Sequence, residues 1–71
     1  MNEHEIPIDV RRAIIEQELQ MYRNTRYQMQ LRHRVQRGVG ASPEMLKPIE
    51  DELERIEGAL DLLARELEEC K

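Results

Sequence analysis

Aromatic residues and cysteines are scarce in this chain, and each shortage argues against a class of fold. Tyr22 and Tyr27 are the only aromatic residues, and there is no phenylalanine or tryptophan. Because β-sandwiches and barrels depend on aromatic and β-branched side chains, this composition disfavours both. The single cysteine, Cys70, cannot form an internal disulfide, which argues against a disulfide-stapled secreted domain and predicts a cytoplasmic location.

Long apolar runs are missing as well. No stretch approaches the roughly 20 apolar residues that a transmembrane helix needs, and the N-terminus lacks the charged-then-apolar order of a signal peptide. We therefore expect no membrane association. With 71 residues, of which 37% are charged, the chain is expected to form one small domain of the all-α class.

The clearest positive feature is a heptad pattern. From Leu46 to Cys70, apolar residues recur at alternating steps of three and four, which places them on one stripe of an α-helix. A second apolar stripe runs from Ile15 to Met29. We expect the two stripes to pack against each other as a hairpin seam, which consists of Ile15, Leu19, Tyr22, Met29, Leu46, Ile49, Leu53, Ile56, Leu60, Leu63 and Leu67.

The residues between the two stripes carry signals for a helix end, a turn and a helix start. Gly38 can adopt the left-handed conformation that ends a helix, Ser42 can cap the next helix, and Pro43 suits its first position. So short a connection makes the two helices antiparallel. The chain is therefore expected to form a single domain (1–71) with a lead (1–7), a first helix (8–37), a turn (38–42) and a second helix (43–70).

Two local points stay open. Pro7 would fit the first position of the first helix, whereas Asp9 could instead act as its N-cap. Pro48 removes a backbone hydrogen bond near the start of the second helix. Either the first turn bends there, or the helix restarts at Pro48.

The first helix has more apolar surface than one neighbouring helix can cover. Val10, Ile14 and Met21 form a second lane beside the seam, and Leu62 lies outside the seam on the second helix. A lone hairpin of this size has a marginal core. We therefore expect a homodimer in which two hairpins pair through these residues as an antiparallel four-helix bundle. The alternative is a hairpin that docks this face on a helix of a different protein.

Charge is divided unevenly along the chain. Residues 1–40 carry seven arginines and five acids, a formal charge of +2, whereas residues 41–71 carry four bases and ten acids, a formal charge of −6. In a hairpin that turns near residue 40, residues whose numbers add up to about 80 face each other. This register predicts ion pairs between Arg12 and Glu68, Arg23 and Glu57, and Arg26 and Glu54.

Arg32, Arg34 and Arg37 face fewer acids and form a candidate anion-binding tip. For the arginine-rich run as a whole, pairing with the acidic second helix is favoured over nucleic-acid binding, because the chain is acidic overall.

The sequence contains no recognisable catalytic or metal-binding pattern. His4 and His33 have no metal ligand at helical spacing, and Gly38 and Gly40 precede no Gly-Lys-Ser or Gly-Lys-Thr. We therefore predict a protein that is not an enzyme, with no catalytic residue, metal, cofactor or small-molecule substrate. Cys70 is either a small apolar filler or a link between two chains.

One segment resembles a known family. Ser42-Pro43-Glu44-Met45-Leu46-Lys47, followed by Asp51-Glu52-Leu53-Glu54-Arg55-Ile56, resembles the second helix of the short hairpins that dephosphorylate response regulators in sporulation relays. The nearest match to that family's Ser-Gln-Glu-Leu-Asp signature is Glu50-Asp51-Glu52-Leu53-Glu54, which lacks the Ser-Gln and has Glu54 in place of the Asp. The resemblance covers under a third of the chain.

From the residues we predict a non-enzymatic protein–protein interaction or assembly module that dimerises or docks through the wide apolar face of the first helix. The alternative is a small regulator that binds a response regulator or nucleic acid through the arginine-rich tip.

Overall fold

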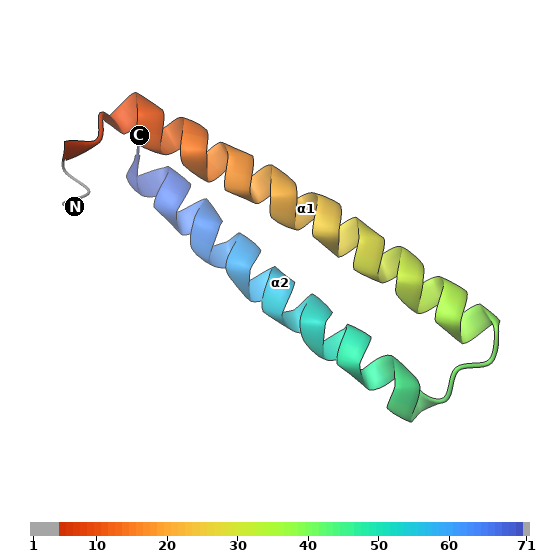
Figure 1. Cartoon of the computed structure of the whole chain (residues 1–71). Helices are drawn as coiled ribbons and strands as arrows, with labels where there is room; N and C mark the ends of the chain where they lie inside the picture. Colours follow the sequence, from red (N-terminus) through yellow and green to blue (C-terminus); the bar gives the residue numbers. More distant parts are fainter. Residues whose placement is uncertain (1–4, 71) are drawn as a thin grey trace.

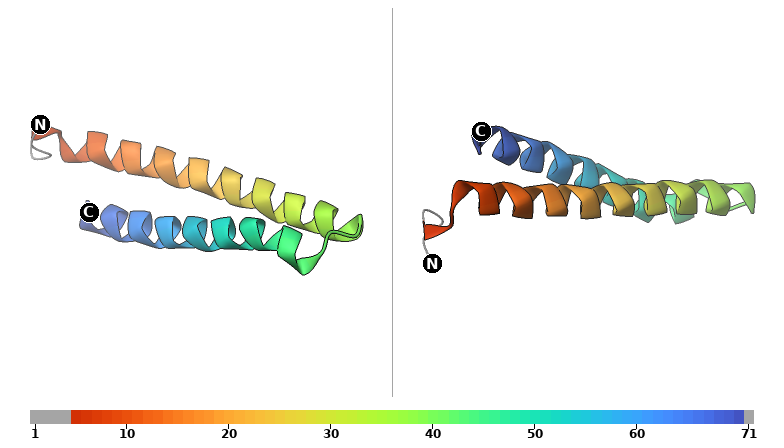
Figure 2. Two further views of the ribbon diagram at one scale, coloured as in Figure 1. Left: turned by 60° about the horizontal axis from the view of Figure 1, so that its bottom comes forward. Right: turned by 90° about the horizontal axis from the view of Figure 1, so that it is seen from above.

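Two long α-helices make up most of the molecule. The computed structural model describes residues 5–70, in which α1 spans Ile8–Gly38 and α2 spans Pro43–Glu69. The helices run antiparallel and pack along their length, with the start of α1 and the end of α2 at one end of the rod and the loop at the other (Figure 1). Figure 2 shows that their axes cross at a shallow angle. The predicted all-α hairpin is confirmed, and the described residues contain no strand.

The start of α1 differs from both alternatives that the sequence left open, which were Pro7 at the first helical position and Asp9 as the N-cap. Pro7 occupies the N-cap position, and its carbonyl accepts a hydrogen bond from the Arg11 N–H at 3.0 Å. Asp9 lies in the first turn, where its carboxylate is favourably placed near the positive end of the helix dipole. No side chain caps this helix.

The left-handed residue of the turn is Gly40, which has a φ of +93°, and the expectation that Gly38 takes this role was wrong. Gly38 is the last residue of α1, and Val39 caps it with a φ of −96°. The Ala41 N–H donates to the Gln36 carbonyl at 2.9 Å, which closes the turn over the last carbonyls of the helix. This closure requires the left-handed backbone conformation at Gly40, two residues after Gly38.

The start of α2 is as predicted. Pro43 is its first residue, and the Ser42 side-chain oxygen accepts a hydrogen bond from the Met45 N–H at 3.3 Å. α2 then continues through Pro48 without a break, so the helix does not restart there. The N-cap and the packing of the rest of α2 hold the first turn in place despite the missing N–H of Pro48.

The core is narrow. Leu19, Ile56 and Leu60 form its buried centre, and Ile15, Tyr22, Met29, Leu63 and Leu67 pack against them while keeping part of their surface exposed. Leu46 and Cys70 are buried near the two ends of α2. Ile49 and Leu53 are half-buried. The hairpin seam residues therefore all lie between the two helices or at the edge of their contact.

The register differs from the predicted one by two to three residues. Three contacts join facing residues whose numbers add up to 82 or 83: Arg12 with Cys70, Arg26 with Glu57, and His33 with Glu50. The predicted pair of Arg26 with Glu54 was therefore wrong, and Arg23 makes no ion pair within residues 5–70. The reason is the loop, since α1 extends to Gly38 and α2 begins at Pro43, which moves the point of reversal beyond residue 40.

Candidate interaction surface

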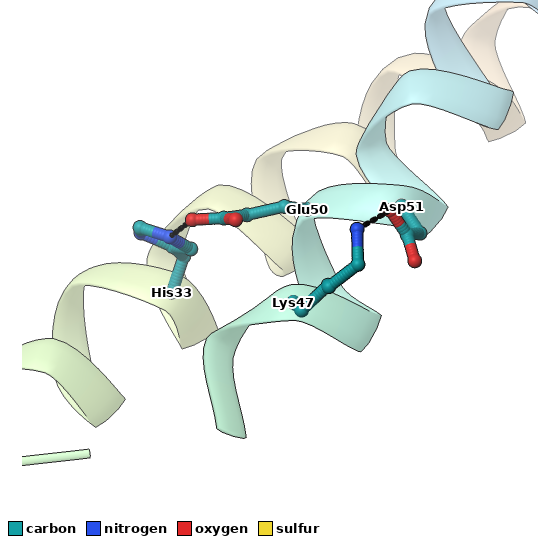
Figure 3. A network of polar contacts seen from close by, with 4 residues as sticks. All are labelled: His33, Lys47, Glu50 and Asp51. Carbon is teal, nitrogen blue, oxygen red and sulfur yellow. Dashed lines mark hydrogen bonds and ion pairs between the residues drawn. The ribbon is translucent and has the colours of Figure 1, made fainter. Parts of the chain in front are cut away.

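Polar side chains interrupt the α1 side of the seam and reach across to α2. The His33 Nε2 atom lies 2.9 Å from the Glu50 Oε2 atom, and on α2 the Lys47 Nζ atom lies 3.4 Å from the Asp51 Oδ1 atom (Figure 3). The Arg26 Nη1 atom lies 3.8 Å from the Glu57 Oε1 atom, and both side chains are more than a third exposed. Exposed pairs of this kind contribute about 0–1 kcal/mol each, so they orient the helices more than they stabilise them.

These contacts mark one side of the hairpin as polar. A shallow hollow on this side is lined by Gln30, His33, Arg34 and Leu53. Because residues seven apart lie on the same side of a helix in a heptad packing, the exposed residues of this side can be assigned from these contacts. We call it the charged face, and it comprises Arg23, Tyr27, Gln30, Arg34 and Arg37 of α1 and Lys47, Glu50, Glu54 and Glu57 of α2.

The predicted interface residues are all exposed to solvent. Val10, Ile14, Met21 and Leu62 have between 45% and 62% of their surface accessible. Val35 is 53% exposed and lies three heptads after Ile14, on the same stripe of α1. The sequence prediction missed Val35, although its spacing from Ile14 and Met21 is a direct signal.

Several exposed apolar residues from both helices lie on the side opposite the charged face. A hollow lined by Ile6, Arg11, Ile14, Ile15, Glu66 and Cys70 shows that the Ile14 stripe of α1 and the Glu66 stripe of α2 border the same side. Ala59 lies one heptad before Glu66, and Leu62 lies one helical turn after Ala59. We call this side the apolar face, and its apolar and small residues are Ile14, Met21, Thr25 and Val35 of α1 and Met45, Ala59 and Leu62 of α2. Charged residues also border it, namely Arg11, Glu18, Arg32 and Glu66.

Val10 lies at the outer border of the apolar face. It is 45% exposed and precedes Ile14 by one helical turn, on the back of α1. Leu31 has the same relation to Val35 and is also exposed. The apolar surface of α1 therefore extends from the apolar face onto the back of the helix.

The structure does not bring the three tip arginines together. Arg32 lines a hollow with Gln28, Leu31 and Val35, at the edge of the apolar face. Arg34 belongs to the charged face, and so does Arg37. In the described part of the chain none of the three forms an ion pair, so their charges are directed to solvent from two different sides.

The remaining candidate groups do not form a chemical centre. The Cys70 side chain is buried, with 5% of the residue exposed, and its carbonyl accepts a hydrogen bond from Arg12 Nη2 at 2.7 Å. His4 lies outside the described residues. Between Glu5 and Cys70, no group of three or more His, Cys, Asp or Glu side chains is arranged to hold a metal ion. Neither α1 nor α2 has the length and apolar character needed to cross a membrane.

Comparisons with known proteins add no relative. No protein-family model, no curated protein and no solved structure matches this chain.

Proposed function

We propose that this chain is a non-enzymatic assembly module that forms a homodimer through its apolar face, giving an antiparallel four-helix bundle. The observation that carries the proposal is the apolar face itself: large apolar side chains from both helices line one side of a hairpin whose own core is narrow. An antiparallel bundle of four helices is the common way to bury such a second face. The lone, buried cysteine favours a cytoplasmic location.

The total exposed area of the chain is consistent with a partner. The chain exposes 5772 Å². A compact monomer of 8.5 kDa exposes about 4,700 Å² by the general relation between mass and surface. The excess of roughly 1,100 Å² exceeds the ≈ 800 Å² that each partner buries in a standard specific interface. The surface is therefore large enough for a stable dimer.

Charge complementarity supports a second copy as the occupant. α1 carries seven arginines and three acids, a formal charge of +4, whereas α2 carries ten acids and three bases, a formal charge of −7. A hairpin with one basic and one acidic helix is complementary to another copy of itself. A second copy therefore satisfies the apolar and the electrostatic requirement together.

Sedimentation equilibrium over a range of concentrations tests the proposal. The unchanged chain should approach twice the monomer mass of 8.5 kDa. The double variant Met21→Glu/Leu62→Glu should sediment as a monomer, since it places charge in the centre of the apolar face. The control is Tyr27→Glu, which adds one negative charge, as each single substitution of the double variant does, at a similarly exposed site on the charged face and should stay dimeric. A fully helical chain that remains monomeric at every concentration would refute the dimer.

A second candidate function rests on the tip arginines, which lack acidic partners among residues 5–70. In this alternative, the ligand is bound by the three arginines Arg32, Arg34 and Arg37. The ligand is either a nucleic acid, bound through its phosphates, or an acidic response regulator. Binding of a labelled single-stranded oligonucleotide should then weaken steeply with salt, because released counterions dominate the affinity. Replacing the three arginines by glutamine should abolish it. An affinity that does not change with salt would exclude this alternative.

A further inference from the structure

We infer that the two-fold axis of the dimer runs parallel to the helices, so that both loops lie at the same end of the bundle and α1 packs against α2 of the partner subunit. This inference rests on the proposed dimer and specifies its geometry. The competing geometry has the axis perpendicular to the helices. It places the loops at opposite ends and stacks each helix on its own copy.

The charges of the helices favour the parallel axis. With the perpendicular axis, α2 lies against α2 of the partner subunit, which brings two helices of formal charge −7 together. With the parallel axis, α1 of formal charge +4 lies against α2 of formal charge −7 on both sides of the interface. The helix dipoles do not separate the two geometries, because every helix is antiparallel to both of its neighbours in either one.

The register within one hairpin provides an independent argument. Because facing residues have numbers that add up to 82 or 83, Met21 of α1 lies level with Leu62 of α2. Thr25 and Arg32 lie within one residue of the levels of Ala59 and Glu52.

Rotation about an axis parallel to the helices does not move any residue along the helix direction. Residues that lie at the same height in one hairpin therefore lie at the same height across the interface. Met21 then meets Leu62 of the partner subunit, and Thr25 meets Ala59 of the partner subunit. Arg32, which forms no ion pair within the described hairpin, gains Glu52 of the partner subunit as an acidic neighbour. In each hairpin Glu52 also pairs with Arg55 of its own helix at 3.6 Å, so it would be shared between the two arginines.

Two unfavourable levels remain. Ile14 lies level with Glu69 of the partner subunit, one heptad after Leu62, and Glu18 approaches Glu66 of the partner subunit. Arg11 lines the same hollow as Glu66 and reduces this repulsion.

The distance between the two loops distinguishes the geometries. Val39 is 77% exposed beside the loop, so a nitroxide label on Val39→Cys is tolerated sterically. Cys70→Val removes the native thiol and keeps an apolar side chain at that buried position. With loops at the same end, the label–label distance should be roughly 10–30 Å, from helix spacings of 8–10 Å plus the label arms. With loops at opposite ends, it should approach the 51 Å length of the molecule.

The outcomes separate this inference from the proposed function. A monomeric mass at all concentrations overturns both the dimer and its geometry. A dimeric mass with the long label–label distance overturns only the geometry. A dimeric mass with the short distance supports both.

Disulfide trapping provides a second readout if Cys70→Val alters folding. Oxidation of a mixture of Met21→Cys and Leu62→Cys chains should give the mixed disulfide in excess over both homodisulfides, with Cys70 retained because its thiol is buried. A mixture of Tyr27→Cys and Glu54→Cys chains, on the charged face, is the control and should remain reduced. A preference for homodisulfides between two Met21→Cys chains would overturn the parallel axis.

Discussion

Single side chains show where the hairpin gives up packing for polar contacts. His33 occupies a seam position that a heptad repeat would fill with an apolar residue, and its side chain keeps 21% of its surface exposed beside Glu50. Arg26 has the same place one heptad earlier and reaches Glu57. These two contacts tie α1 to particular residues of α2. They therefore contribute to register, while the apolar seam residues provide most of the stability.

We predict that His33→Leu stabilises the hairpin. A leucine at this position would pack between the helices near Met29 and Leu53, and burying most of its surface should add about 1–2 kcal/mol to the free energy of unfolding. Urea unfolding at one fixed chain concentration measures the change, with Glu50→Gln as a control that removes only the charge of the partner. A lower midpoint for His33→Leu would show that the contact with Glu50 outweighs apolar packing.

The helices as units differ in how they begin. α2 has the Ser42 N-cap and Pro43 at its first position, whereas α1 begins after Pro7 without a side-chain cap. α2 also contains Pro48 in its second turn, where the absent N–H leaves the backbone ladder one hydrogen bond short. The loop end of α2 is therefore the place where its backbone is least well satisfied.

Pro48→Ala should stabilise α2. Alanine restores the missing N–H and has a helix propensity about 3 kcal/mol better than that of proline in a helix interior, so we expect a gain of about 1–3 kcal/mol near the helix start. Thermal unfolding followed by circular dichroism measures it. Pro43→Ala is the matched control and should change stability little, since proline is well suited to the first position. An unchanged midpoint for Pro48→Ala would mean that proline at this position costs the helix nothing.

The hairpin as a whole is a rod with two unlike sides. The charged face carries the contacts of Arg26 and His33 with α2, and the apolar face carries Met21 and Leu62, which are 56% and 62% exposed and are not covered by the rest of residues 5–70. A second hairpin packed on the apolar face would bury that face and enlarge the narrow core at the same time. In the proposed dimer, folding and assembly are therefore coupled.

This coupling predicts that the melting temperature rises with chain concentration, because mass action favours the folded dimer over unfolded monomers. Differential scanning calorimetry over a hundredfold concentration range measures it. Met21→Glu/Leu62→Glu should melt at a lower temperature that does not depend on concentration. A concentration-independent melting temperature for the unchanged chain would contradict coupled assembly.

Local features of the sequence were enough to determine both helices and the cap between them. The heptad spacing from Leu46 onward and the Ser42-Pro43 pair act through neighbours within about four residues, which is the range of helix hydrogen bonds and caps. The hairpin therefore followed from the chain without any knowledge of its contacts.

The pairing of the helices was determined only in three dimensions. Arg26 meets Glu57 rather than Glu54, and the reversal of the chain occurs at Gly40 rather than Gly38. Both depend on how the loop closes over the end of α1, and a shift of a few residues there moves every facing pair along the seam. The same register places Met21 level with Leu62, because interdigitation of side chains from two helices is a property of neither helix alone.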